Sequence, residues 1–228
     1  MIKEISIRLL ALVMSVLITT SAFAQVGIFD ANIDVDGGNL GAVGTTTYDP
    51  TTDTYTITGS GHDIWDQEDD FQFVYKKWSG DFVLKTDVSL DAGTSTSEWA
   101  KACLMARQDL EPGSPNICTR VRPDGTYFNL QFRAQRNGQT VFGEKDVGGQ
   151  NPGTHILERV GNVFTAYYVD ENGKSVFVAD ENFELQDPIL VGLAVTAHET
   201  GSLSTGTFRN VSLSAGAPSF TEDWELYH

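Results

Sequence analysis

Short segments in which apolar and polar residues alternate fill most of the chain beyond residue 50. Alternation with period two places successive side chains on opposite faces of a β-strand. We predict strands at 54–59, 71–75, 80–90, 99–107, 116–121, 127–135, 155–159, 163–169, 174–179, 189–198 and 206–213. Turn-forming residues such as Asn172 and Gly173 lie between them, and no segment after residue 24 has a useful helical period. The pattern therefore predicts an all-β sandwich of two antiparallel sheets.

The apolar parity of these strands predicts the core. Two packed sheets lie about 10 Å apart, and the side chains of their inner faces fill the space between them. The predicted core residues are Phe71, Phe73, Tyr75, Phe82, Leu84, Val88, Ala102, Leu104, Ile117, Val121, Phe128, Leu130, Phe132, Val191, Leu193 and Val195.

The other parity of the central strands is polar. In the segment AKACLMAR (100–107), Lys101 and Arg107 share a face with a cysteine and a methionine. The same face continues with Asn116, Cys118, Arg120, Tyr127, Asn129, Gln131, Arg133, Thr196 and His198. These residues form one contiguous face if Asn129 lies opposite Arg120. That register requires a four-residue loop or a bulge, since a three-residue loop would place Phe128 there.

The first 24 residues read as a secretory signal peptide. Lys3 and Arg8 precede a short apolar run, 9–18, and the segment ends in an A-x-A cleavage pattern, 22–24. The apolar run is too short to span a bilayer, and no second apolar run of that kind follows. We therefore expect a secreted or periplasmic protein with one domain, 25–215, a tail, 216–228, and no membrane span.

Charge is distributed unevenly along the chain. The net charge is −16, and removing residues 1–24, which carry +1, leaves −17. This acidity argues against nucleic acid as a partner. Residues 101–136 nevertheless carry six cations and three carboxylates, a net charge of +3. The polar face is thus the basic part of an acidic protein, and we expect its cations to face outward toward an anionic or polyhydroxylated ligand.

The two cysteines of the mature chain are Cys103 and Cys118. In exported proteins two cysteines usually pair. A hairpin centred on LEPGSP (110–115) would place Cys103 directly opposite Cys118, at a distance that a disulfide can bridge. The sequence therefore predicts a disulfide.

Several motifs resemble one bacterial group. These are Gly59, Gly61, Asp63, Ile64 and Trp65 in a G-x-G-x-D-I-W run, and AKACLMAR, which has Cys103 where glycine is usual. The match extends over about 27–213. The chain resembles secreted concanavalin A-like lectin/glucanase domains labelled "regulation of enolase protein" or of unknown function. This resemblance implies a jelly roll of two curved sheets, with a sugar site on the concave sheet.

We hypothesise a non-catalytic, lectin-like carbohydrate-binding domain whose partner is a polysaccharide or glycan. Its expected ligand-binding residues are Lys101, Arg107, Tyr127, Asn129, Gln131, Arg133 and His198. Trp65 and Trp99 are candidate stacking platforms at the rim, and packing is the alternative role for each. For Arg107 and Arg133 the alternative is structural pairing with carboxylates.

A polysaccharide lyase acting on uronates is the second hypothesis. β-Elimination needs cations or amides that neutralise a carboxylate and a group that moves the proton. Arg107 and Arg133 would neutralise it, and Tyr127 or His198 would carry the proton. A retaining glycosidase is disfavoured because its two carboxylates are missing from the strands; Glu222, Asp223 and Glu225 occur only in the tail.

A structural or interaction domain without a small ligand is the third hypothesis. No cofactor is required by any of the three. The segments 34–38 and 66–70 offer oxygen ligands for calcium, although neither has the spacing of a known loop motif. The acidic residues at 66–70 otherwise read as a solvent-facing loop, and Asp63 as a turn-forming residue before Trp65.

Overall fold

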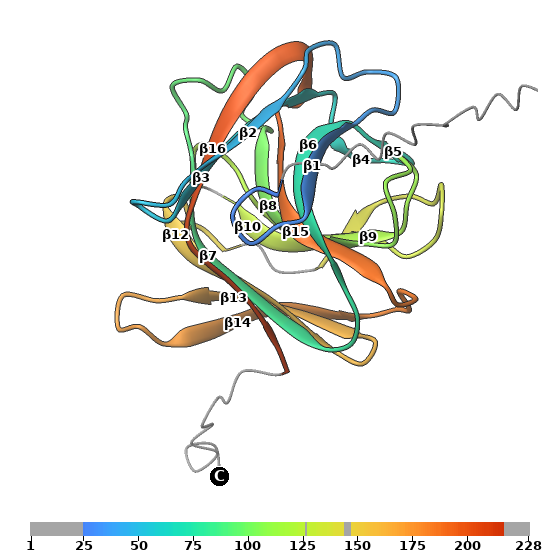
Figure 1. Ribbon diagram of the computed structural model, residues 1–228, viewed down its shortest axis with the longest axis vertical. Helices are drawn as coiled ribbons and strands as arrows, with labels where there is room; N and C mark the ends of the chain where they lie inside the picture. Colours follow the sequence, from blue (N-terminus) through green and yellow to red (C-terminus); the bar gives the residue numbers. More distant parts are fainter. Residues whose placement is uncertain (1–24, 126, 144–146, 217–228) are drawn as a thin grey trace, which may run out of the picture.

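The computed structural model describes residues 25–125, 127–143 and 147–216, and none of these is helical. Two seven-stranded antiparallel sheets pack against each other (Figure 1). The first sheet has the order β1 (Ala31–Val35), β6 (Phe71–Trp78), β15 (Ile189–Thr196), β8 (Lys101–Arg107), β9 (Asn116–Val121), β10 (Phe128–Arg133) and β11 (Val141–Phe142). The second has the order β14 (Ser175–Asn182), β13 (Val163–Val169), β12 (Gly153–Val160), β7 (Phe82–Leu90), β16 (Glu199–Ala215), β3 (Thr54–Gly61) and β2 (Thr45–Asp49).

The sequence pattern predicted the all-β class and the two sheets. It missed the short or mostly polar strands β1, β2 and β11, together with a small hairpin formed by β4 (Ile64–Trp65) and β5 (Glu68–Asp69). The predicted signal peptide, 1–24, lies outside the described residues. So does all of the predicted tail after Gly216, including Glu222, Asp223 and Glu225.

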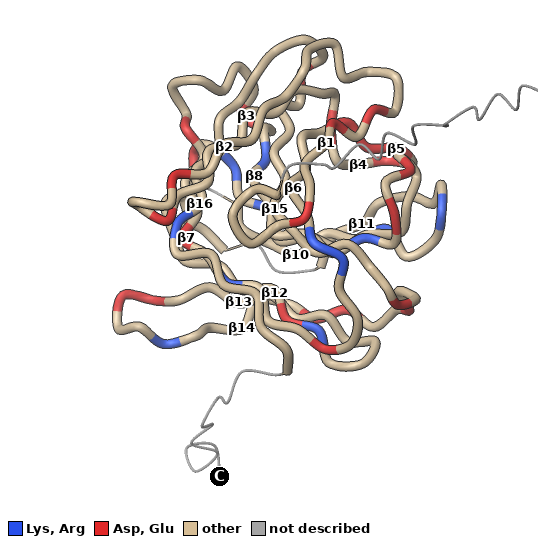
Figure 2. Tube along the Cα trace, viewed as in Figure 1, with Lys and Arg blue, Asp and Glu red and all other residues tan. Residues whose placement is uncertain are grey.

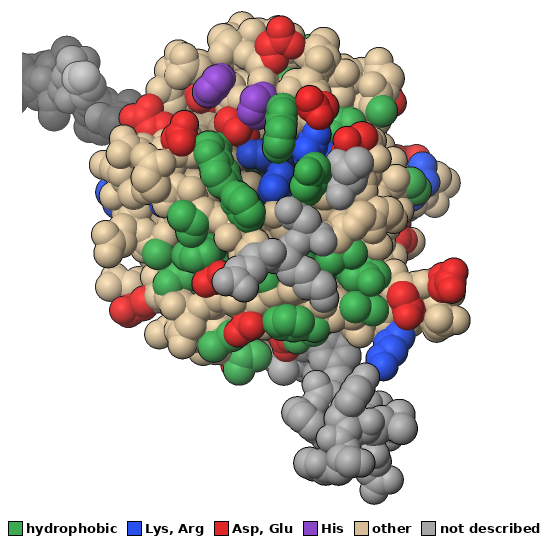
Figure 3. All heavy atoms as spheres, turned by 180° about the vertical axis from the view of Figure 1, so that it is seen from behind, with side chains coloured by type: hydrophobic (Ala, Val, Ile, Leu, Met, Phe, Trp, Pro, Cys, Tyr) green, Lys and Arg blue, Asp and Glu red, His purple; other side chains and the backbone are tan. Residues whose placement is uncertain are grey.

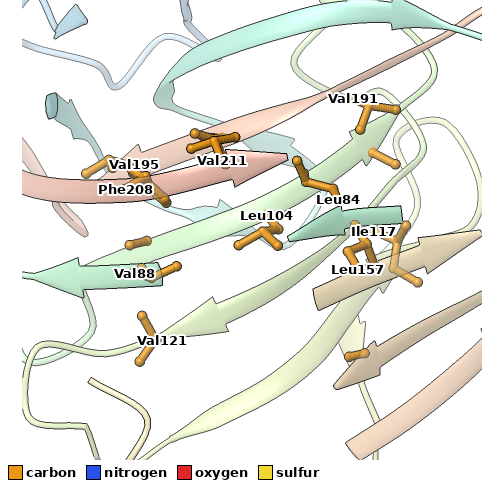
Figure 4. Packing of buried hydrophobic residues seen from close by; sticks show 14 of the residues in the cluster. Leu84, Val88, Leu104, Ile117, Val121, Leu157, Val191, Val195, Phe208 and Val211 are labelled. Atoms are coloured by element: carbon orange, nitrogen blue, oxygen red, sulfur yellow. The ribbon is translucent and has the colours of Figure 1, made fainter. Parts of the chain in front are cut away.

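The main core lies between the sheets. Leu104 and Ile117 of the first sheet and Leu84, Val88 and Leu157 of the second belong to one buried cluster (Figure 4). Each of these side chains is at most 1% exposed. Burying one large aliphatic side chain contributes roughly 1.5–3 kcal/mol, so this layer is the main source of stability.

One part of the predicted core was wrong. Phe71, Phe73 and Tyr75 do not face the second sheet; they belong to a separate cluster with Met105 and Cys103. On β6 it is Val74 that points into the main core. Both parities of this strand are buried, because the first sheet is covered on its outer face as well. Alternation alone cannot assign the inner face of such a strand.

The cover on the outer face includes the β4–β5 hairpin. Ile64 of β4 packs into the outer cluster with Phe71 and Met105. In the central strands, Asn129 pairs with Arg120 and Cys118 with Met105. The register that joins the polar residues of β8, β9 and β10 into one face is therefore present, and the hairpin lies on that face.

Candidate functional site

The polar face divides into a buried half and an open half. In the buried half, Arg107 and Arg133 have fully buried side chains and share one carboxylate, that of Asp69 in β5. Arg133 Nη2 lies 2.6 Å from Asp69 Oδ1, and Arg107 Nη1 lies 3.3 Å from Asp69 Oδ2. Arg133 Nη1 also donates to Asp69 Oδ2 at 2.8 Å, and Asn116 Nδ2 is the third residue that donates to this carboxylate, at 3.1 Å. A buried carboxylate with this many charge-assisted partners is a structural ion cluster.

Backbone carbonyls of the hairpin and of the 109–114 loop accept most of the remaining hydrogen bonds. Arg133 Nη2 donates to the Trp65 carbonyl at 2.9 Å, and Gln131 Nε2 donates to the Ile64 carbonyl at 2.8 Å. Arg107 Nε and Nη2 each donate at 2.6 Å to the carbonyls of Asp109 and Glu111. The polar residues of β8 and β10 thus hold the hairpin and the 109–114 loop on the sheet.

This arrangement corrects the expectation that the cations of AKACLMAR face outward. Arg107, Arg133, Gln131 and Asn129 are each 0% exposed, and Lys101 is 3% exposed. The alternative role given above for the two arginines, pairing with a carboxylate, is the one they have. Asp69 and Asp70 are likewise buried, so the 66–70 segment is not a wholly solvent-facing loop.

The open half is a pocket of about 300 Å³ next to the hairpin. Its lining residues are Asp63, Trp65, Trp99, Lys101, Arg120, Phe142 and His198. Figure 3 shows the corresponding surface, where Lys and Arg side chains lie in a hollow between hydrophobic side chains, with histidines beside them. Figure 2 shows that acidic residues elsewhere are spread over loops and strand ends. The pocket is thus a local basic site on an acidic molecule.

Asp63 organises the polar side of the pocket. Its Oδ1 lies 2.5 Å from Lys101 Nζ, and its Oδ2 lies 3.2 Å from His198 Nε2. It also accepts the Ile64 backbone N–H at 2.7 Å, which is the turn-forming role expected from the sequence. Burial alone would raise the pKa of Asp63, but Lys101 and His198 outweigh it and lower the pKa to about 2. The carboxylate therefore remains ionised.

Aromatic rings form the rim. Trp99 is 43% exposed and Phe142 is 50% exposed, and both line the same pocket. Trp99 stacks on Tyr127 at a centroid distance of 6.3 Å, and the Arg122 guanidinium lies 3.9 Å from the Trp99 ring centroid. Arg122 is held in turn by Glu98 at 2.6 Å. The exposed indole therefore has a fixed orientation.

Of the predicted ligand-binding residues, the structure brings Lys101 and His198 into the lining of the pocket, together with both candidate platforms, Trp65 and Trp99. Tyr127 stacks on Trp99. Arg120 and Asp63 also line the pocket; Arg120 was expected on the polar face but not as a ligand-binding residue, and Asp63 was expected to form a turn. Arg120 donates from Nε to Asn129 Oδ1 at 2.7 Å. Phe142 was missed, since it lies in a two-residue strand with no pattern around it. The net positive charge of residues 101–136 was the sequence feature that could have identified Arg120 as a site residue.

The predicted disulfide is absent, and the predicted register was wrong. Cys103 lies opposite Arg120, and Cys118 lies opposite Met105, so the two cysteines are diagonal neighbours. Pairing Cys103 with Cys118 requires a hairpin midpoint between residues 110 and 111, whereas the hydrogen bond from Gln108 N to the Pro115 carbonyl places the midpoint between residues 111 and 112. Both cysteines are free, buried thiols. Burial and the neighbouring Cys118 raise the pKa of Cys103 well above its usual value.

The two segments considered for calcium lie side by side. Asp70 Oδ1 accepts the backbone N–H of Gly37 at 2.7 Å and that of Asn39 at 3.1 Å. Asp36 accepts the Gly38 N–H at 2.8 Å. The carboxylates here therefore order a loop. Among the described residues, no group of three or more His, Cys, Asp or Glu side chains is arranged to hold a metal ion.

No helix within the described part of the chain is long and apolar enough to cross a membrane. No protein-family model matches the sequence, and no curated protein matches it. The resemblance to the "regulation of enolase protein" group therefore stays a prediction.

Solved structures do resemble the fold. A functionally unknown protein from Saccharomyces cerevisiae is 18% identical with a TM-score of 0.59, covering 76% of this chain and 97% of that one. An alginate lyase from Corynebacterium sp. is 8% identical with a TM-score of 0.51, covering 81% and 93%. A GH43 protein, BlXynB, from Bacillus licheniformis is 8% identical with a TM-score of 0.52, covering 75% and 40%. These similarities establish a concanavalin A-like jelly-roll sandwich.

Proposed function

We propose that this protein binds a polysaccharide or glycan chain, without cleaving it, in the pocket lined by Trp65, Trp99 and Lys101. The observation that carries the proposal is the combination of exposed, oriented aromatic rings with buried cations in one hollow. Sugar rings present apolar C–H faces that stack on aromatic side chains, and their hydroxyls and carboxylates take hydrogen bonds from cations.

An anionic glycan is the favoured ligand class. Lys101 and Arg120 line the pocket, and Arg122 lies directly behind the Trp99 ring. A basic hollow on a chain of net charge −16 attracts an anionic polymer locally while the remaining surface keeps the protein soluble. The alginate lyase that shares the fold is named for an anionic polysaccharide. That similarity supports the ligand class and does not extend to the reaction.

The lyase hypothesis has lost two of its four residues to the ion cluster. Arg107 and Arg133 have their charge and most of their donors satisfied by Asp69 and backbone carbonyls, so they have no access to a uronate. Tyr127 stacks on Trp99 and is not among the residues that line the pocket. His198 remains in place, but one proton carrier does not supply the neutralisation that elimination requires. Binding is therefore the better-supported activity.

We also propose a location and a family for this protein, and both proposals rest on sequence motifs. The predicted signal peptide supports a secreted or periplasmic domain, where soluble glycans are accessible. The G-x-G-x-D-I-W and AKACLMAR motifs support the concanavalin A-like "regulation of enolase protein" group. Asp63, Trp65 and Lys101 of these two motifs lie together in the pocket.

A panel of polysaccharides tests the binding proposal. Native gels containing alginate, polygalacturonate, hyaluronan or a neutral β-glucan should show retardation by at least one anionic polymer. Trp99→Ala should weaken it by at least about tenfold, as expected when a central aromatic contact is removed. Phe177→Ala is the matched control, because Phe177 is 47% exposed on β14 of the second sheet, away from the pocket.

The same panel distinguishes the alternatives. Ultraviolet-absorbing unsaturated products from any uronate polymer would overturn the binding proposal in favour of a lyase. Retardation that Trp99→Ala leaves unchanged would move the site elsewhere. A folded protein that no polymer retards would favour a structural or interaction domain.

A further inference from the structure

Two residues that line the pocket, Asp63 and His198, form a hydrogen-bonded chain with Ser97, which contacts His198. Ser97 Oγ lies 3.3 Å from His198 Nδ1, and His198 Nε2 lies 3.2 Å from Asp63 Oδ2. They come from three separate segments: the loop before β8, the β15–β16 connection and the turn before β4. A hydroxyl, an imidazole and a carboxylate in this order are the parts of a nucleophilic hydrolase.

The proton positions follow from the partners. Ionised Asp63 only accepts, so the neutral form of His198 donates from Nε2–H to it, and its Nδ1 is left to accept the Ser97 hydroxyl proton. His198 has a φ of 57°, in the left-handed region. Non-glycine residues adopt this region infrequently, and histidine is among the types enriched in it. In this conformation the ring of His198 lies between Ser97 Oγ and Asp63 Oδ2.

We propose that Ser97, His198 and Asp63 form a catalytic triad that hydrolyses small acyl esters, such as acetyl groups carried on a sugar hydroxyl. The sugar part of this substrate rests on the proposed glycan binding, whereas the ester chemistry does not. The pocket of about 300 Å³ has room for one acylated sugar residue, and its exposed indole would contact the ring.

The reaction is a two-step acyl transfer. Ser97 Oγ attacks the ester carbonyl while His198 Nδ1 takes the hydroxyl proton. The tetrahedral intermediate then expels the sugar alkoxide, which receives that proton, and leaves an acyl-serine. His198 then takes a proton from water, which attacks the acyl-serine; the intermediate releases the carboxylic acid, and His198 returns the proton to Ser97 Oγ. Lys101 and Arg120 line the same pocket and would stabilise the negative charge that develops on the carbonyl oxygen.

Two probes test the triad without a sugar. The mature protein should be labelled by a fluorophosphonate at Ser97, located by tandem mass spectrometry, and should hydrolyse p-nitrophenyl acetate. Ser97→Ala should abolish the labelling and reduce hydrolysis to the rate in buffer. His198→Asn should lower the rate by at least about 100-fold, the usual contribution of a general base.

Ser95→Ala is the matched control. Ser95 lies in the same loop, but its Oγ donates to the Asp91 carbonyl at 2.9 Å. Labelling and hydrolysis should be unchanged in this variant. Thermal melts of all variants establish that each is folded. A folded wild-type protein that is neither labelled nor active would overturn the triad, as would full activity in Ser97→Ala.

The glycan panel separates the two proposals. Retardation by a polysaccharide without ester hydrolysis would remove only the triad. Hydrolysis of p-nitrophenyl acetate without retardation would remove only glycan binding.

Discussion

Arg133 Nη2 lies 2.6 Å from Asp69 Oδ1, and both side chains are fully buried. Arg107 reaches the other oxygen of the same carboxylate, so one negative charge serves two guanidinium groups. The contact joins β10 to β5 and thereby fixes the β4–β5 hairpin, whose Trp65 forms one wall of the pocket. Arg107 and Arg133 thus support the site without lining the pocket.

Asp69→Asn should strongly destabilise the protein. It leaves Arg107 and Arg133 buried without a counter-charge, and removing one partner of a buried ion pair costs about 3–5 kcal/mol. Urea unfolding of the wild type and the variant measures this difference in the free energy of unfolding.

The control for Asp69→Asn is Asp109→Asn. Asp109 pairs with Arg136, but both side chains are substantially exposed. An exposed pair contributes at most about 1 kcal/mol. Equal losses of unfolding free energy in the two variants would show that the buried Asp69 ion pairs stabilise the protein no more than an exposed pair does.

Much of this fold was predictable from the sequence, because a strand with one buried face shows alternating apolar and polar residues. Leu84, Leu104 and Leu193 were assigned correctly to the core on that basis. Phe71 and Phe73 were not, since the outer face of β6 is covered as well. Strand parity determines which residues share a face but not what covers that face.

The site was predicted in part for the same reason. Lys101 and His198 were recognised as members of a polar face, and the Asn129–Arg120 register proved correct. The hairpin that conceals Arg107 and Arg133 is only a pair of two-residue strands, too short to leave a periodic pattern. Its acidic sequence gave no sign that Asp69 would be the buried counter-ion.

His155 should make stability fall as the pH falls from 6.5 to 4. Its ring is buried against Phe128, and burial lowers the pKa of His155 from 6.5 to about 4. The unfolded chain therefore takes up a proton in this range before the folded protein does, which favours unfolding. The loss reaches about 3 kcal/mol at pH 4, since one pKa unit corresponds to about 1.4 kcal/mol.

His155→Leu should remove this fall of the unfolding free energy between pH 6.5 and pH 4, whatever the stability of the variant at neutral pH. The measurement is the free energy of unfolding in urea at several pH values between 4 and 7. His62→Asn is the control, because His62 is exposed and should leave the slope intact. A slope that persists in His155→Leu would assign it to other groups.

The two cysteines should be unreactive in the folded protein. Both thiols are buried, and the raised pKa of Cys103 keeps it protonated, whereas thiolates are the reactive form. A thiol reagent should therefore modify neither residue in native protein and both after unfolding. If unfolded, unreduced protein also has no reactive thiols, the cysteines are joined in a disulfide after all.

Asp63 should make the free energy of unfolding fall further between pH 4 and pH 2, below the pH range in which His155 acts. Its pKa is about 2 in the folded protein, against 3.8 ordinarily. A depressed carboxyl pKa contributes stability above pH 4, and this contribution is lost as the pH falls toward 2. The expected loss is about 2 kcal/mol. Asp63→Asn should remove this part of the pH dependence, whereas Asp180→Asn, a change at an exposed carboxylate of β14, should not.

A double-mutant cycle on Asp63 and Lys101 tests the ion pair itself. Asp63→Leu leaves the buried Lys101 ammonium without its carboxylate and should cost about 3–5 kcal/mol. Lys101→Met leaves Asp63 with His198 as its remaining partner and should cost less. The double variant should lose much less than the sum, because replacing both members of a buried pair by apolar side chains is often nearly neutral. Additive losses would mean that the 2.5 Å contact between Lys101 Nζ and Asp63 Oδ1 contributes no coupling. In that case the low pKa of Asp63 would have to come from His198 alone.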